Sequence, residues 1–415
     1  MRRRMFAILL AGVGIIGGAG AAALPGATST GDVLTGRVVV IEASTVDGTE
    51  VPHDVVIEAD DGTRTLLAPS EATDEIAELV GQEVEVTGDL EVTNLSETAA
   101  LAVNDFRYIP SYWPPPSGAK RAVVIRFNFA SGSLPYANTA EDLQAQVFDG
   151  PNSLAGMWAK ESRGKLTLTG NVITDTLPAN LPRTCDSTAG EAWRTHFTSK
   201  YPGYSFYLMI PPRIGCGNVA ARADILSGGS WFYTGVSPRE LWHELGHNVG
   251  FGHAASLSCT ADGKSASISS SCTRSVYGDS LTAMGGGSGA CAYSGWNRIT
   301  AEWDLQWAQV TSDSTIQLRA RDLNADGRPQ AIVIPGAPTE WGGFYYLEWR
   351  TADYPTCYST ALQGLQVRVV PNAQAGMYSH LLSADPGKST TLGVGRTFTD
   401  PMAKLNVRVD ALDAA

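Results

Sequence analysis

Residues 243–253 read His-Glu-Leu-Gly-His-Asn-Val-Gly-Phe-Gly-His, and they hold three of the six histidines in a chain of 415 residues. On an α-helix, His243 and His247 project from one face about one turn apart. Gly250 can adopt the positive φ that ends a helix and turns the chain back, so that His253 supplies a third nitrogen. Three neutral imidazoles with one open position are typical of catalytic zinc, whereas structural zinc sites are closed by four protein ligands.

The helix that carries these histidines has its own start signal. Ser237, Pro238 and Glu240 match an N-cap serine, a proline at the first helical position and a glutamate at the third. We therefore predict a helix over residues 238–249. On this helix Glu244 points in a neighbouring direction, where it can reach a water at the open position without being a ligand.

The histidine motif, together with a methionine turn further along, resembles the metzincin zinc peptidases. Residues 277–285 read Tyr-Gly-Asp-Ser-Leu-Thr-Ala-Met-Gly and provide the candidate turn. The sequence of this turn is most similar to that of the gametolysin family of extracellular metallopeptidases. The resemblance covers about residues 120–310. Within them, residues 120–129 are similar to the family's first strand and residues 158–170 to its early helix and strand.

The resemblance implies an α/β (α+β) metzincin-like catalytic domain with Zn²⁺ as its cofactor. Its metal ligands would be His243, His247 and His253, and Met284 would form the apolar floor beneath them. Related families place a tyrosine ligand just after the methionine, but glycines follow Met284 here, so no tyrosine is assigned to the metal. Metzincins bind substrate as an extra strand along an edge strand. Residues 205–210 predict a buried strand, and residues 221–233 are the expected substrate-facing edge.

The expected activity is that of a zinc metalloendopeptidase acting on extracellular proteins or peptides. Zinc lowers the pKa of water to about 7 and polarises a carbonyl. Glu244 would serve as general base and then as general acid. Two alternatives remain open: an inactive adhesion or wall-binding protein, and a zinc amidase that acts on non-peptide amides. An intact Glu244 argues against the inactive protein.

Changes in composition divide the chain into five parts. We predict a signal peptide at 1–29, an acidic β domain at 30–107, a Pro-rich linker at 108–119, the peptidase domain at 120–310 and a β-sandwich domain at 311–415. The signal has three arginines, an apolar stretch and a small-residue region, so the protein is expected to be secreted by the general or the twin-arginine route. No later stretch is long and apolar enough to predict a membrane span in the mature chain.

The N-terminal domain is strongly acidic. Residues 31–105 hold 18 acidic residues against Arg37 and Arg64, whereas the rest of the chain is close to neutral. Neither part has the clustered basic charge that nucleic acid requires. Short apolar runs around a helix at residues 70–79 favour a small OB-like barrel. Such a module is either a propeptide or folding aid, or an accessory binding domain. Because no cysteine precedes Cys185, it cannot cap the zinc with a thiolate.

Six cysteines in an exported chain predict three disulfides, for which 15 connectivities exist. The expected pairs are Cys259–Cys272, Cys185–Cys216 and Cys291–Cys357. Thiolate metal ligands are disfavoured because the chain has no Cys-x-x-Cys spacing.

In the C-terminal part, runs of alternating apolar and polar residues are separated by turn residues, as in a β-sandwich. Strands are expected at residues 315–319, 331–335, 344–349, 365–370 and 405–409. Asp322, Asn324 and Asp326 resemble the first half of a calcium loop, but Val333 stands where such loops use a glutamate. A tight turn is therefore the alternative to Ca²⁺ binding. A monomer is assumed.

Overall fold

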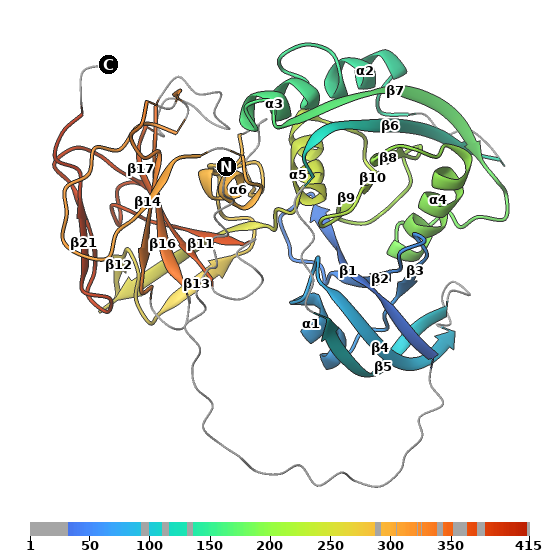
Figure 1. Ribbon diagram of the computed structural model, residues 1–415, viewed down its shortest axis with the longest axis horizontal. Helices are drawn as coiled ribbons and strands as arrows, with labels where there is room; N and C mark the ends of the chain where they lie inside the picture. The colour runs from blue at the N-terminus through green and yellow to red at the C-terminus, as the bar shows by residue number, and fades with distance from the viewer. Residues whose placement is uncertain are drawn as a thin grey trace, which may run out of the picture. The chain divides into compact units, whose positions relative to one another are not determined.

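The computed structural model describes residues 32–92, 99–109, 116–130, 136–286, 292–303, 305–321, 323–324, 326–337, 343–351, 363–371 and 378–412. Residues Asp32–Ala415 form one compact unit. The predicted signal peptide lies outside the described residues. The fold is mixed α/β, and strands predominate over helices (Figure 1).

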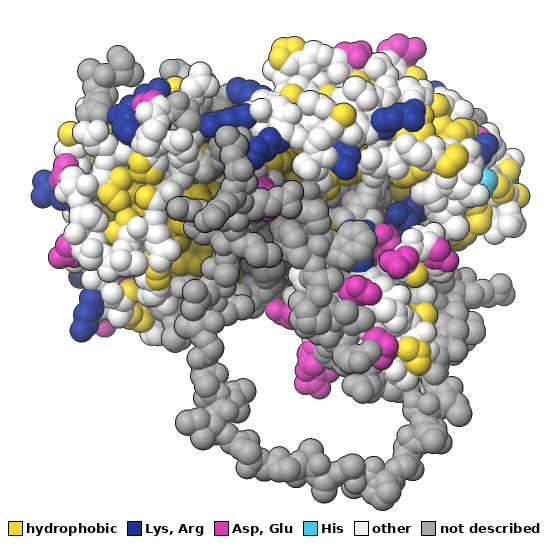
Figure 2. All heavy atoms as spheres, viewed as in Figure 1, with side chains coloured by type: hydrophobic (Ala, Val, Ile, Leu, Met, Phe, Trp, Pro, Cys, Tyr) yellow, Lys and Arg dark blue, Asp and Glu magenta, His cyan; other side chains and the backbone are white. Residues whose placement is uncertain are grey.

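The N-terminal strands form an antiparallel group in the order β3-β2-β1-β4-β5. Its elements are β1 (Asp32–Thr45), β2 (Asp54–Glu58), β3 (Arg64–Leu66), α1 (Glu71–Ala77), β4 (Glu83–Val92) and β5 (Ala99–Ile109). The Ser70 hydroxyl caps α1 by accepting from the Thr73 amide, so the predicted helix at 70–79 is confirmed. Figure 2 shows acidic side chains gathered over these N-terminal elements.

The central strands carry the helices. The strands are β6 (Gly118–Phe129), β7 (Leu166–Leu177), β8 (Phe206–Ile210), β9 (Val219–Asp224) and β10 (Gly229–Phe232). The helices are α2 (Ala140–Val147), α3 (Leu154–Glu161), α4 (Ser187–Lys200) and α5 (Pro238–Asn248). Apolar side chains of α2, α3 and α5 pack on one face of these strands, and those of α4 pack on the other. The predicted strand at 205–210 is confirmed as β8.

Strand β9 is not the free edge that we expected at residues 221–233. It pairs antiparallel with β10 on one side and with β1 on the other. Within the described residues, the N-terminal and central strands therefore form one ten-stranded sheet across the predicted boundary at residue 107. The sequence could not reveal this pairing, because partners so far apart in the chain leave no local signal.

A second sheet combines the segment after His253 with the C-terminal strands. Its elements are β11 (Ala254–Ala261), β12 (Lys264–Ala266), β13 (Cys272–Ser275), β14 (Trp307–Gln309), β15 (Ala331–Pro335), β16 (Phe344–Arg350), β17 (Gly364–Val370), β18 (Ser379–Leu382) and β19 (Thr391–Leu392). Strand β11 pairs parallel with β18, so this sheet crosses the predicted boundary at residue 310. A two-stranded sheet of β20 (Thr397–Asp400) and β21 (Leu405–Arg408) and the helix α6 (Gly295–Thr300) complete this part.

Four of the five predicted C-terminal strands are confirmed as β15, β16, β17 and β21. The strand expected at residues 315–319 is wrong, because that stretch forms no ladder. The Arg319 amide instead donates a hydrogen bond to the Pro329 carbonyl. An alternating pattern without a partner strand alongside it does not make a strand.

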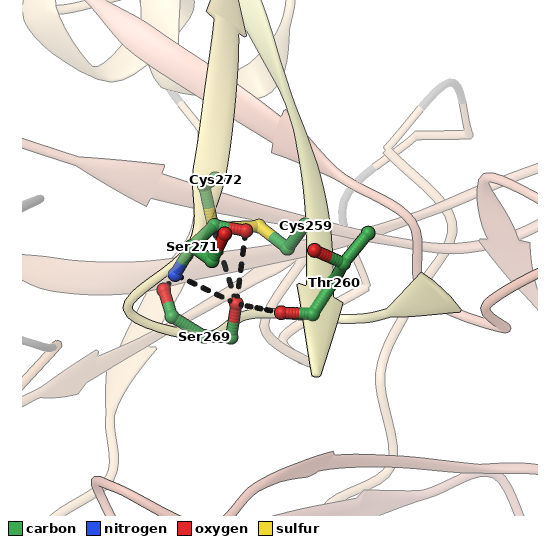
Figure 3. The surroundings of a disulfide bond; sticks show 5 residues. All are labelled: Cys259, Thr260, Ser269, Ser271 and Cys272. Atoms are coloured by element: carbon green, nitrogen blue, oxygen red, sulfur yellow. Dashed lines mark hydrogen bonds between the residues drawn. A yellow bond between two sulfur atoms is a disulfide. The ribbon is translucent and has the colours of Figure 1, made fainter. Parts of the chain in front are cut away.

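Two predicted disulfides are confirmed. Cys185 bonds to Cys216, and Cys259 bonds to Cys272. At the second bond, the Ser269 hydroxyl donates to the Thr260 carbonyl at 2.8 Å and accepts from the Ser271 amide at 3.0 Å (Figure 3). The predicted Cys291–Cys357 bond lies outside the described residues.

Removing the Cys259–Cys272 bond is expected to lower the free energy of unfolding. The bond joins residues 13 apart in sequence. Closing a loop of this size restricts the unfolded chain by about 3 kcal/mol. Urea unfolding of the Cys259→Ala/Cys272→Ala variant should show this loss. A midpoint unchanged from the parent protein would contradict it.

Candidate metal centre

Helix α5 begins and ends as its sequence indicates. The Ser237 hydroxyl accepts from the Glu240 amide at 3.5 Å, and Pro238 occupies the first turn. The helix buries Leu241 and Leu245 in the core shared with β9 and β10. Gly250 follows with φ +97°, and a Cβ there would meet Leu226 Cδ2 at 2.6 Å. A side chain at this turn would therefore be strained, and the turn brings His253 back towards the helix.

The three histidines of the motif converge in the structure. The ring centroids of His243, His247 and His253 lie 4.8–5.2 Å apart, and their ligand atoms all lie within 4.8 Å of one another. All three side chains are buried, and no Nε2 atom has a hydrogen-bond partner. Three converging buried nitrogens without partners could hold a metal ion. No other group of this kind occurs in the described part of the chain.

The opposite nitrogen of each ring faces an oxygen. His243 Nδ1 lies 2.8 Å from the Ala283 carbonyl oxygen, and His247 Nδ1 lies 2.6 Å from that of Phe251. His253 Nδ1 lies 3.6 Å from Glu42 Oε2. The carbonyl acceptors at Nδ1 of His243 and His247 hold the proton there, so the Nε2 lone pairs of these two rings are left for a metal. The donor set therefore fits zinc.

Burial keeps these imidazoles neutral. It lowers the pKa of His243 to about 4, and the pKa values of His247 and His253 fall well below the usual 6.5. The neighbouring histidines and Arg274 lower the pKa of His253 further. Metal ligation requires the neutral ring, so the site is prepared for a cation at physiological pH.

Glu244 is a fully buried carboxyl beside the histidines. Burial raises its pKa to about 8, while the nearby Ser44 hydroxyl and Arg222 lower it and Glu240 and Glu42 raise it. Neither carboxylate oxygen has a hydrogen bond of good geometry. A carboxyl in this environment can accept and release a proton near neutral pH.

The Glu244→Gln substitution should stabilise the metal-free protein as pH rises. A glutamate carboxyl ordinarily has a pKa of 4.5, whereas the pKa of Glu244 in the folded protein is about 8, so this carboxyl favours the folded state in acid and loses that contribution as pH rises between these values. Glutamine has no such dependence. The stability of the variant relative to the parent should therefore rise by about 1.4 kcal/mol per pH unit over this interval. Urea unfolding of chelator-treated proteins at about pH 5 and pH 8 measures the difference, and a constant difference would refute the buried-carboxyl argument.

Two further side chains border the centre. Met284 is fully buried and packs against Gly246 of α5, in the turn between His243 and His247. The ring centroid of Tyr277 lies 4.4 Å from that of His253, and the Tyr277 hydroxyl donates to the Ala43 carbonyl at 2.6 Å.

A cavity of about 490 Å³ opens beside His243. Ser44 and Thr45 of β1, Tyr233, Arg239 and Tyr277 contribute to its lining. The N-terminal strands therefore form part of its wall.

Sequence reasoning missed two residues of the centre. Glu42 was available as the one acidic side chain in the apolar run of residues 38–43. Tyr277 stood in the predicted methionine turn, but its contact with β1 had no local signal. Of the candidate calcium ligands, Asp322 lies outside the described residues, and the Asp326 carboxylate bonds to Arg328. Calcium stays a prediction.

No protein-family model matches the chain, and no curated protein matches it. Among the described residues, no helix is long and apolar enough to cross a membrane.

Proposed function

We propose that the protein is a secreted zinc-dependent endopeptidase with a metzincin-like catalytic region. The observation that carries this proposal is the convergence of three partnerless, buried Nε2 atoms next to the buried carboxyl of Glu244. His243, His247 and His253 would hold the zinc, and Met284 would support them from below. The two disulfides are in keeping with export.

The residues around the zinc have separate tasks in peptide hydrolysis. When bound, zinc supplies Lewis acidity and lowers the pKa of a water molecule to about 7. Glu244 accepts the proton of the attacking water and passes it to the leaving amine. The backbone oxygens of Ala283 and Phe251 keep His243 and His247 in the tautomer that exposes Nε2.

A peptide substrate is favoured over a non-peptide amide by the strand beside α5. Strand β9 presents main-chain groups that pair with an extended chain, as its ladder with β1 demonstrates. Such a surface recognises the repeating amides of a peptide backbone. The buried Glu244, which carries a desolvation cost, argues against an inactive binding protein.

The finer fold assignments belong to the same proposal. We assign an OB-like barrel to β1–β5, in keeping with the antiparallel order β3-β2-β1-β4-β5 and the place of α1 between β3 and β4. We assign a β-sandwich to the C-terminal strands, whose apolar faces share one core.

Zinc analysis combined with a cleavage assay tests the function. The purified protein should contain one zinc per chain and cleave an unfolded protein substrate. A chelator should remove both properties, and added zinc should restore them. The cleaved bonds and any new N-terminus of the enzyme itself are then mapped by mass spectrometry. Zinc-free protein that cleaves at an undiminished rate would refute the proposal.

A further inference from the structure

The outer edge of β9 beside the metal centre is covered by the chain's own β1. Residues Ile41 to Ser44 lie opposite Asp224 to Ala221 in an antiparallel register, and a bulge follows at Thr45. Beyond Ile41, β1 has left its ladder with β2, so this segment of β1 pairs with β9 alone. It leaves the sheet at the exposed loop of residues 47–50.

The backbone of this segment is held from both sides. The Val40 carbonyl accepts from the Ile225 amide, and the Val46 amide donates to the Asn218 carbonyl. Even-numbered residues of β1 therefore direct their backbone groups at the β9 side. The Ala43 carbonyl points the other way and accepts from the Tyr277 hydroxyl at 2.6 Å. The segment thus lies between β9 and Tyr277.

Alternate side chains of the segment face the centre. Glu42 Oε2 lies 3.6 Å from His253 Nδ1, and the Tyr378 hydroxyl donates to Glu42 Oε1 at 2.9 Å. Ser44, two residues on, lines the cavity together with His243 and lies close enough to Glu244 to affect its pKa. The segment therefore passes directly over the ligands and the general base.

We propose that residues 41–45 occupy the surface that binds an extended peptide substrate, so that the N-terminal strands inhibit the enzyme in cis. This inference rests on the proposed function, because a peptide must lie across His253, His243 and Glu244 to be cleaved. An extended chain that pairs antiparallel with β9 in place of β1 meets the same groups as β1 does. Substrate can enter only after β1 has left β9.

Ion pairs fasten β2 and β3, the neighbours of β1, to the central part of the sheet. Arg64 of β3 donates to both carboxylate oxygens of Asp224 at 2.9 and 3.0 Å, and its Nη1 lies 2.9 Å from Glu191. Asp54 of β2 accepts from Arg222 of β9 at 2.9 Å. Breaking the Arg64–Asp224 pair would leave buried charges without partners, which is costly. We therefore expect the intact chain to cleave peptides slowly, and cutting the chain after the N-terminal strands to raise that rate.

A tethering experiment in the full chain tests this inference. A recognition sequence for a site-specific protease is inserted between Ser117 and Gly118, which are both exposed. The variant S44C/A221C joins β1 to β9 at facing positions, and the control variant T35C/E85C joins β1 to β4 inside the N-terminal group. Zinc content, melting temperature and cleavage of a quenched peptide are measured before and after cutting, followed by gel filtration in urea below the unfolding midpoint.

Cutting should raise peptide cleavage in the untethered and control proteins but not in the S44C/A221C protein. The increase should be about 100-fold if β1 and the peptide probe bind β9 with equal affinity. The linked strand then competes at an effective concentration of about 1 mM against a probe at about 10 μM. A reductant should then release activity from the S44C/A221C protein, with the equally treated parent as reference.

Three results would count against these claims, and they can be told apart. Equal cleavage by the tethered and untethered proteins after cutting would overturn the inference and leave the proposed function standing. A remainder that cannot be separated from β1–β5 without losing zinc or unfolding would show that β1 is a fixed part of the fold, which also overturns the inference. A separated, folded and zinc-loaded remainder that cleaves no peptide would refute the proposed function itself.

Discussion

Replacing Glu244 by glutamine is expected to lower the rate of peptide cleavage by about 10²–10⁴-fold while the zinc stays bound. Glutamine keeps the size of the side chain but cannot take a proton from water. The carboxylate is not a ligand in the proposed site, since the three converging nitrogens belong to the histidines. The loss should appear as a lower kcat in steady-state kinetics. The zinc content should remain at one ion per chain.

The same substitution elsewhere provides the control. Glu141 lies on the exposed side of α2, outside the centre, and the Glu141→Gln variant should cleave at the parental rate. Urea unfolding of both zinc-loaded variants at the assay pH checks that unfolding does not account for the loss of activity. A Glu244→Gln enzyme with near-parental turnover would assign the proton transfer to another group.

Replacing Arg368 by methionine is expected to cost about 3–5 kcal/mol of folding free energy, because it removes one partner from a buried ionic network. Arg368 donates to Asp279 Oδ2 at 2.8 Å and to Glu348 Oε1 at 2.9 Å, and all three side chains are fully buried. The substitution leaves the Asp279 carboxylate without its cation in the segment that leads to Met284. Urea unfolding of the zinc-loaded protein measures the loss.

An exposed ion pair in the same part of the chain is the control for the effect of burial. Arg396 and Asp385 form a pair at 2.7 Å in which the arginine side chain is 43% exposed. Its Arg396→Met variant should lose far less stability than the Arg368→Met variant, because solvent screens an exposed pair. If both variants lost the same amount, the claim that burial makes the Arg368 network costly to break would be wrong.

The parts of the site with a local signal could be predicted from the sequence. Ser237 and Pro238 mark the start of α5, and the spacing of His243 and His247 places them on one face of it. Gly250 marks the turn that returns His253. The disulfide between Cys259 and Cys272 follows from their closeness in the chain. Each of these features depends on residues close to one another in the chain, where propensity and spacing are informative.

The parts that depend on distant segments could not be predicted. The pairing of β1 with β9 brings Ala43 opposite Arg222, and neither residue carries a sign of the other. The contact of Glu42 with His253 follows from that pairing alone. The parallel pairing of β11 with β18 likewise has no turn or periodicity to announce it. Register between strands is set by packing of the whole sheet, which a single sequence does not display.

His253 is followed immediately by β11, whose outer partner β18 lies more than a hundred residues further along the chain. A shortened version that ends at residue 310 would lack β18. The strand β11, which directly follows His253, would then be paired on one side only. Anyone who seeks the smallest fragment with the proposed activity should therefore expect its affinity for the metal to change when the C-terminal half is removed.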